Sequence, residues 1–439
     1  MTARLAALAA TLLVTLWPDT AEAYTWMIRH GYGGCTTCHA DPSGGETLTA
    51  YGRIQGDLLL RMRYGKDSVS AAASETKSAD FDSFDSFDAQ AGGEANAGEA
   101  APASAPESSE GASPTAGFLW GLVELPEWLL LGGSYRHMNV IKPDSEDDKF
   151  STFPMQADLY GQLQLGRVRV AGDIGVIKVE PNSPHGRAAQ ITTSQGDDMN
   201  LVSRTHWIGV DVTPDVLVRA GRINLPFGVR IPEHVMWARE ATRTDRDSDQ
   251  QHGVSVSFQG DWLRGEIMGI AGNFQINPDR FRERGYSLYL EALASDWAAL
   301  GISSLVTRAE EDRLLLNGDV MTRQAHGGFA RLAPLSQLAL LIEANGLLRS
   351  SNKPGYVAFA QADYEVVQGL HLMLTGEALD EGKPRDQPGL DAVTGQGKPR
   401  FGGWASVDWF FLPHLEMRLD GLKRQDEPFT LLAQLHAYL

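Results

Sequence analysis

The chain of 439 residues carries a formal net charge of −18 and has a pI near 5.0. This acidity argues against nucleic acid and against anionic membrane surfaces as partners. The 46 glycines, 10 tryptophans and 11 tyrosines, with 43% hydrophobic residues, favour a protein of many strands joined by tight turns.

Residues 1–23 have the pattern of a secretory signal peptide. Arg4 gives a positive start, residues 5–17 are apolar, and Ala21-Glu22-Ala23 is a small-x-small cleavage site. The apolar run is shorter than the about 20 residues that a spanning helix needs, and no other stretch is long enough. We therefore expect export, a mature chain beginning at Tyr24, and no transmembrane helix.

Residues 24–65 form a predicted haem-binding head. Cys35-Thr36-Thr37-Cys38-His39 contains both cysteines of the chain and matches the C-x-x-C-H signature of c-type haem attachment. In that chemistry the two thiols bind the haem vinyl groups and the next imidazole binds the iron. We therefore predict one covalent haem c at Cys35, Cys38 and His39. A disulfide would leave His39 without a role, and a zinc site would need more cysteine or histidine ligands than one such pair.

The second axial ligand of the haem iron has two candidates in the head. His30 precedes the motif, and its alternative role is that of a solvent-facing loop residue. Met62 is the less favoured candidate, because it also fits simple packing on a helix face. Either residue type is ordinary in an electron carrier. Helical spacing from Leu48 to Met62, after a possible capping box at Ser43, predicts one amphipathic helix against the haem.

Residues 66–116 form a predicted acidic, low-complexity tether. The segment holds ten acidic residues and two lysines and is rich in Ala, Ser and Gly. Such a composition cannot bury enough apolar surface to offset the entropy of ordering. Three evenly spaced phenylalanines, Phe81, Phe84 and Phe87, are either a docking segment or part of the low-complexity sequence.

Residues 117–439 alternate between apolar and polar side chains, as in Val254, Val256 and Phe258 with serines between them. A water-soluble β-protein also shows such alternation. Seven short turns separated by long loops, with one further strand at each end, indicate 16 strands. This rhythm is typical of an antiparallel outer-membrane β-barrel whose short turns face the periplasm. The short turns are expected near Gly166, Thr213-Pro214-Asp215, Gln259-Gly260-Asp261, Ala294-Ser295-Asp296, Ala333-Pro334-Leu335, Gln368-Gly369 and Leu412-Pro413-His414.

Three groups of side chains fit the barrel hypothesis. Aromatic residues near strand ends are expected to form girdles at the membrane surface: Trp207, Trp262, Trp297, Trp404, Trp409, Phe410 and Phe411. Alternating carboxylates are expected to line the lumen: Asp211, Asp363, Glu365, Glu377, Asp408, Glu416 and Asp420. The loop from 224 to 253 is either a solvated surface loop or a ferrous iron site at the outer mouth; its candidate ligands are Glu233, His234, Glu240, Asp245, Asp247, Asp249 and His252.

The order of these parts resembles the fused monohaem cytochrome c–porins of the bacterial outer membrane, best known from iron-oxidising bacteria. In that family a leader is likewise followed by one haem-binding motif and a barrel of about this size. Sequence similarity is confined to the head, where the motif is followed by Leu48-Thr49-Ala50-Tyr51-Gly52-Arg53, similar to the family's L-T-x-F-G-R segment. By that match Cys35, Cys38 and His39 carry over as haem-binding residues. The long acidic tether departs from the compact family pattern.

The resemblance implies an all-β, 16-stranded barrel with a small, mostly helical cytochrome c head, in the outer membrane of a Gram-negative bacterium. It implies electron transfer between an extracellular donor or acceptor, with Fe(II) favoured, and a periplasmic c-type cytochrome or other redox carrier. Outer-membrane lipid is the remaining partner. The alternative is a diffusion porin whose haem head is a sensor or plug.

The position of the head is the remaining question at the level of sequence. The head is close to the length, about 40 residues, below which a fold usually needs outside support, and a barrel wall could supply it. A 16-stranded barrel also leaves an aqueous interior unless something fills it. We therefore favour a head inside the lumen, although the tether is long enough for it to hang free in the periplasm.

Overall fold

The computed structural model describes residues 25–30, 34–64, 118–119, 121–145, 149–178, 189–191, 199–233, 235–246, 248–273, 282–311, 320–350, 352–383 and 397–439. The predicted signal peptide and the predicted tether, with its three phenylalanines, lie outside these residues.

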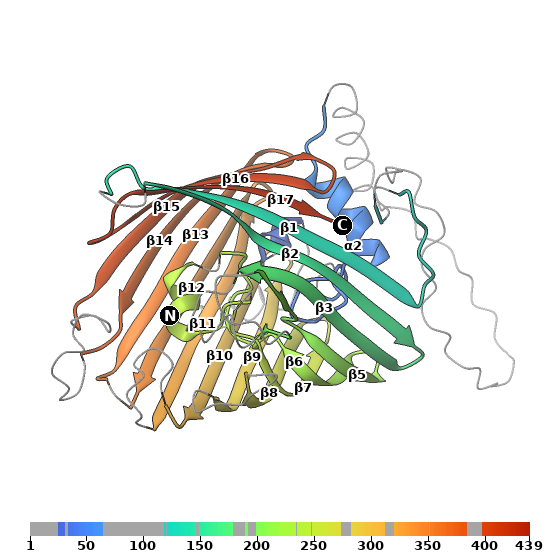
Figure 1. Ribbon diagram of the computed structural model, residues 1–439, viewed down its shortest axis with the longest axis horizontal. Coiled ribbons are helices and arrows are strands. Elements are labelled where there is room, and N and C mark those ends of the chain that lie inside the picture. The colour runs from blue at the N-terminus through green and yellow to red at the C-terminus, as the bar shows by residue number, and fades with distance from the viewer. Residues whose placement is uncertain are drawn as a thin grey trace, which may run out of the picture.

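The described strands form one closed antiparallel barrel (Figure 1). Each strand pairs with its neighbours in the chain, and the last strand pairs with the first. Two short strands, β4 and β5, both pair with β3, so together they make one barrel strand interrupted at Ser203, and the 17 segments form 16 barrel strands. The segments are β1 Leu129–Ile141, β2 Phe150–Leu165, β3 Val168–Lys178, β4 Met199–Val202, β5 His206–Thr213, β6 Val216–Ile223, β7 Gln251–Gln259, β8 Leu263–Gly272, β9 Arg284–Ser295, β10 Ala298–Ala309, β11 Met321–Leu335, β12 Leu338–Arg349, β13 Gly355–Val367, β14 Leu370–Asp380, β15 Arg400–Leu412, β16 Leu415–Arg424 and β17 Thr430–Tyr438.

The burial of side chains is inverted relative to a water-soluble β-protein. On β7, Val254 is 55% exposed and Val256 is 41% exposed, whereas Ser255 between them is fully buried. The apolar face of the strand therefore points outward and the polar face points into the barrel. An apolar exterior around a polar interior is the arrangement that a lipid bilayer requires. This inversion decides between the membrane barrel and the soluble alternative.

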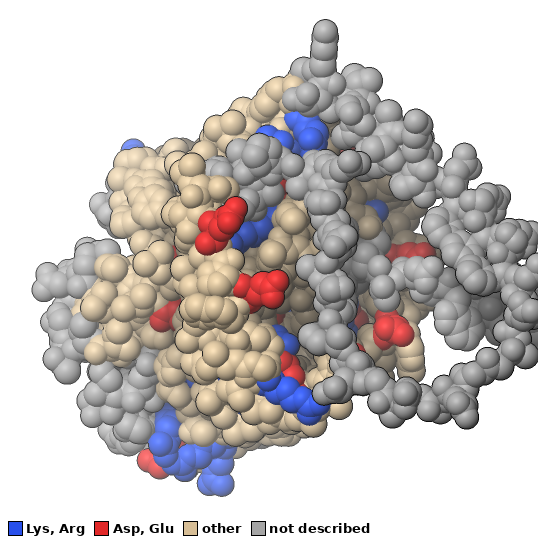
Figure 2. Space-filling model, turned by 90° about the vertical axis from the view of Figure 1, so that its right-hand side faces the viewer, with Lys and Arg blue, Asp and Glu red and all other residues tan. Residues whose placement is uncertain are grey.

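One side of the described surface carries few charged side chains. Figure 2 shows the side of the molecule on which α2 lies in Figure 1. Most of its described surface belongs to uncharged residues, and acidic and basic side chains stand in small groups. This face of the described surface therefore offers no broad patch of a single charge.

Seven short turns alternate with longer connections, as the sequence predicts. One turn differs in position, because β11 continues to Leu335 and includes Pro334. The pairing with β12 shifts register between Leu332 and Leu335. Proline cannot donate a ladder hydrogen bond, and such an irregularity is where a strand tolerates it. The turn therefore follows two residues later than expected.

The prediction of an aromatic girdle is correct for Trp262 and Trp297, which are 67% and 51% exposed. It is wrong for Trp207, Trp404 and Phe410, which are buried. These three lie on inward-facing positions and have partners there. Arg219 stacks on the Trp207 ring at 5.2 Å, and Trp404 Nε1 donates a 2.9 Å hydrogen bond to Glu377. The Phe410 ring lies 6.3 Å from that of Trp26. Trp409 and Phe411 are half-buried.

The described helices are all short: η1 Thr25–His30, α2 Ala50–Gln55, η2 Gly56–Leu60 and α5 Trp237–Thr242. The predicted head helix corresponds to α2 and η2, which follow each other directly. Its cap is Thr49, whose hydroxyl accepts a hydrogen bond from Gly52 N, and not the expected box at Ser43. Glu46, the second residue of that box, instead has a positive φ of 62°. Among the described helices, none is both long and apolar enough to cross a membrane.

Candidate functional site

The first part of the head is fixed inside the barrel through Arg29. Its side chain is fully buried and lies 3.4 Å from Asp363 and 3.4 Å from Glu365, both on β13. Its guanidinium also lies 2.9 Å from the ring of His371 on β14. The preceding Trp26 packs against the same site, with its ring 4.6 Å from the Arg29 guanidinium and 4.6 Å from the His371 ring. The inward-facing carboxylates predicted from alternation thus hold a residue of the head.

A second group of contacts joins the segment after the haem motif to the opposite wall. Asp41 forms a 2.5 Å ion pair with Arg219 on β6. The Thr205 hydroxyl donates a 2.6 Å hydrogen bond to Glu46, and Arg230 donates to the Ser43 carbonyl at 3.1 Å. The described part of the head therefore contacts the lumen on several sides.

The end of the head crosses the rim that carries the short turns. Gln368 donates hydrogen bonds to the Leu58 carbonyl at 2.6 Å and to the Arg61 carbonyl at 2.9 Å. Met62 N donates to the Phe410 carbonyl at 2.9 Å, and Tyr64 donates to that of Phe411 at 3.1 Å. These contacts, with those of Arg29 and Asp41, place residues 25–30 and 34–64 within the barrel and its rim instead of free beneath it.

The C-x-x-C-H motif forms a tight turn. His39 N donates to the Cys35 carbonyl at 2.9 Å, and Cys35 and Cys38 are not joined by a disulfide. Helix α2 packs its Gly52 directly on Cys38, because an added Cβ at this position would overlap the Cys38 carbonyl. Gly44, with a φ of +75°, faces the Cys35 thiol in the same way. Glycine at position 44 thus leaves space for the Cys35 sulfur, and glycine at position 52 lets α2 pack on the Cys38 backbone.

His39 is held as a neutral base in this site. Burial and the nearby Arg246 guanidinium lower the pKa of its imidazole to about 4. The ring is therefore uncharged at neutral pH, which is the form that binds a metal ion. Its neighbours within the described chain supply no complete metal site of their own, since no group of three His, Cys, Asp or Glu residues there could hold an ion.

Cys35, Cys38 and His39 all face one open cavity of about 2000 Å³ in the lumen. This volume includes open solvent, because the cavity is continuous with the rest of the lumen. Trp26, Met27 and Phe410 give the cavity apolar walls, while several arginines and carboxylates give it polar ones. A haem, with an apolar ring and two carboxylate side chains, fits such a lining. The donor set and the cavity are therefore compatible with the predicted cofactor.

The two predicted distal ligands do not line this cavity. His30 lies 3.5 Å from Glu365, beside the Arg29 site. The Met62 sulfur accepts a 3.4 Å hydrogen bond from Trp409 at the rim. Met27 and His436 do line the cavity, and His436 lies 2.8 Å from Glu416 and 3.0 Å from Ser134. A lone histidine in the last strand carries no signal in the sequence that would single it out.

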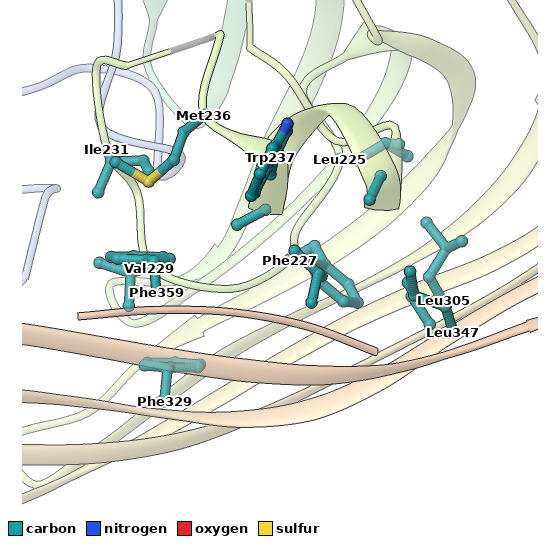
Figure 3. Packing of buried hydrophobic residues seen from close by; sticks show 14 of the residues in the cluster. Leu225, Phe227, Val229, Ile231, Met236, Trp237, Leu305, Phe329, Leu347 and Phe359 are labelled. Carbon is teal, nitrogen blue, oxygen red and sulfur yellow. The ribbon is translucent and has the colours of Figure 1, made fainter. Parts of the chain in front are cut away.

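The loop between β6 and β7 folds into the barrel instead of standing at its outer mouth. Its apolar residues and α5 pack on side chains from the barrel wall, as Figure 3 shows for Val229 beside Phe359. Glu233, one of the candidate iron ligands, forms a 2.9 Å ion pair with Arg418 on β16. The expectation of an exposed loop is therefore wrong for its described part, because its apolar side chains find a buried surface inside. His234 and Asp247 lie outside the described residues.

No protein-family model and no curated protein sequence matches the chain. Several solved structures do match. A loop-deletion mutant of OmpT, an outer membrane protein of Vibrio cholerae, is 11% identical, with a TM-score of 0.51, over 71% of this chain and 99% of that chain. OmpF of Salmonella typhi, in a complex with daunomycin, is 12% identical, with a TM-score of 0.51, over 71% of this chain and 97% of that one. The chain therefore has the fold of bacterial outer-membrane barrels, and its apolar exterior agrees with a place in that membrane.

Proposed function

We propose that this protein transfers electrons across the bacterial outer membrane through a single haem c bound inside its barrel. Cys35 and Cys38 would hold the haem through thioether bonds, and His39 would bind its iron. The periplasmic partner is a c-type cytochrome or another soluble redox carrier, and extracellular Fe(II) is the favoured donor.

The observation that carries the proposal is the position of the C-x-x-C-H motif. Both cysteine thiols and a neutral imidazole face one cavity in the lumen, which the barrel wall separates from lipid. Buried pairs such as Arg29 with Asp363 hold this segment to the wall. A cofactor held there would lie between the two faces of the membrane and could pass electrons from one side to the other without leaving the protein.

The proposal requires an electron donor outside the membrane and an electron acceptor in the periplasm. The haem, when bound, supplies exchange of one electron. Oxidation of one Fe(II) ion to Fe(III) at the outer side releases one electron, and the periplasmic partner accepts one electron. The apolar band of such a barrel is about 25 Å tall, so a partner has to approach from each side. The head, which ends at the rim of short turns, is suited to the inner approach.

Two measurements on the outer-membrane form test the proposal. Covalent haem is read by peroxidase staining after denaturing electrophoresis, and its reduction by dissolved Fe(II) is followed through the α-band. Wild type and the conservative control Thr36→Ser should stain and be reduced, whereas the Cys35→Ala/Cys38→Ala double variant should carry no covalent haem. A wild-type protein with no covalent haem, or with haem that Fe(II) never reduces while the barrel conducts ions freely, would contradict the proposal.

The second candidate function is a diffusion porin whose head is a plug or sensor. The 16-stranded fold and its likeness to OmpF favour it. The head and the inward loop both occupy the lumen, however, and reduce the space for diffusion. Ion conductance of purified protein in planar bilayers separates the two functions, since a porin conducts with or without haem.

A further inference from the structure

The inward loop brings one arginine, Arg246, to the haem motif. Its guanidinium lies so close to Gly45 that a Cβ added there would overlap it. It is also near enough to His39 and Glu46 to act on them electrostatically. Arg246 and Gly45 both line the cavity that Cys35, Cys38 and His39 face.

Arg246 differs from the other arginines of this cavity in its charge partners. Arg204 pairs with Asp158, Arg230 lies 3.7 Å from Glu266, and Arg418 pairs with Glu233. Arg136 acts electrostatically on Glu416. Within the described part of the chain, Arg246 has no carboxylate within ion-pair distance.

Glu46, a carboxyl group that Arg246 faces electrostatically, is a weak counterion. Burial raises the pKa of Glu46 well above its usual range, and the neighbouring Asp173 and Asp41 raise it further. The Glu46 hydrogen bond from Thr205 only partly offsets this effect. Among the described residues, this cation of the cavity wall thus has no ionised carboxylate at ion-pair distance.

The consecutive glycines 44 and 45 relate Arg246 to the attachment site. Gly44 faces the sulfur of Cys35, and Gly45 faces the guanidinium of Arg246. Two consecutive residues of one short turn of the head therefore face the thiol and the cation, respectively. A haem attached at Cys35 and Cys38 would thus share with this guanidinium the cavity that all three residues line.

We infer that Arg246 binds a propionate carboxylate of the haem attached at Cys35 and Cys38, so that the loop between β6 and β7 completes the haem site. The inference rests on the proposed function. Arginine suits this role because its planar guanidinium can bind both oxygens of a carboxylate and stays charged in a buried site. The loop then positions the cofactor against the head as well as narrowing the lumen.

The test compares the midpoint potential of the haem in full-length Arg246→Gln, Arg246→Lys and wild type by redox titration of the α-band. Removing the cation should favour oxidised haem by about tenfold at a fixed potential, a shift of about 59 mV for one electron. The lysine variant should retain most of the wild-type value. Arg169→Gln is the matched control, because Arg169 pairs with Asp211 in the barrel but does not line the cavity.

A second variant, Gly45→Ala, displaces the Arg246 guanidinium without removing its charge, and should shift the potential in the same direction. It decides the question if Arg246→Gln fails to fold. Equal potentials in wild type, Gly45→Ala and Arg246→Gln would overturn the inference while leaving the proposed function intact. Absence of covalent haem from wild type would instead overturn the proposed function, and the inference with it.

Discussion

At the scale of single residues, charge in the lumen is balanced by specific partners. Arg29 is the clearest example, because its fully buried guanidinium sits among Asp363, Glu365 and His371. A buried ion pair adds little net stability when it forms, since both charges lose their hydration. Removing one partner is far more costly, because the remaining charges stay buried and uncompensated. Arg29 therefore fixes where the head sits.

Replacing Arg29 with alanine should weaken docking of the head by about 3–5 kcal/mol. The measurement is urea denaturation followed by limited proteolysis of the head in lipid vesicles. Arg63→Ala is the matched control, because Arg63 is also in the head but is half-buried and donates a 3.3 Å hydrogen bond to the nearby Leu58 carbonyl, so its loss is expected to cost about 1.5 kcal/mol. Equal proteolysis of the two variants would show that the Arg29 site does not anchor the head.

The two kinds of site residue differ in how far the sequence predicts them. Cys35, Cys38 and His39 lie within five consecutive residues, so their spacing alone predicts a haem-attachment site before any fold is known. Arg29 and Arg246 have no such spacing. Arg29 meets His371 across 342 residues of sequence, and only closure of the barrel brings them together. The sequence favours a head in the lumen but gives no indication of which side chains hold it there.

At the scale of elements, the loop between β6 and β7 has the largest effect on the lumen. Leu225, Phe227 and Val229 are all buried, and α5 adds Trp237, which is 2% exposed (Figure 3). Trp237 N donates a 2.9 Å hydrogen bond to Glu377 on β14, and Arg424 of β16 stacks on the Trp237 ring at 4.7 Å. The loop is thus attached to the wall through both apolar and polar contacts.

Trp237→Ala should release this loop and raise the ion conductance of the barrel. Truncating a buried tryptophan typically costs about 3–5 kcal/mol, and this loss weakens the packing that holds the loop against the barrel wall. The measurement is single-channel conductance in planar bilayers. The control is Trp262→Ala, on the exterior, which should leave conductance unchanged. Identical conductance in both variants and wild type would mean that the loop does not limit the pore.

Strands and turns are predictable here because alternation and turn residues are local signals. The inward loop is harder to predict, since its many charged residues suggest a solvated surface. One signal was present in the alternating apolar residues Leu225, Phe227, Val229 and Ile231, which continue the pattern of β6 past its end. The girdle prediction failed at Trp207 and Trp404 for a related reason, because aromatic residues near strand ends do not reveal which face of the barrel they occupy.

At the scale of the whole molecule, the inverted burial pattern fixes how the barrel sits in lipid. Leu374 on β14 is 67% exposed, and its neighbours His371 and Thr375 are buried in the lumen. The exterior is thus apolar at positions where a soluble protein would carry polar residues. On this face, lipid covers the apolar side chains that the core would cover in a soluble protein.

Leu374→Arg should destabilise the folded barrel in vesicles by about 2–4 kcal/mol if the position is near the bilayer midplane. Leu335→Arg, at the end of β11 and next to a short turn, should cost only about 0–1 kcal/mol. Both costs are measured from urea unfolding in lipid vesicles, where tryptophan fluorescence reports the transition. Equal costs at the two positions would argue that this exterior does not face a bilayer.

The most direct test of the central claim is electron transfer across a vesicle membrane that contains the purified protein. A soluble c-type cytochrome is enclosed as the acceptor, Fe(II) is added outside, and the absorbance of the enclosed cytochrome is followed with time. We predict reduction of the enclosed cytochrome by wild type and by Thr36→Ser, and none by the Cys35→Ala/Cys38→Ala variant, in vesicles that exclude Fe(II). Reduction at the same rate by the double-cysteine variant, or no reduction by haem-loaded wild type, would contradict the account.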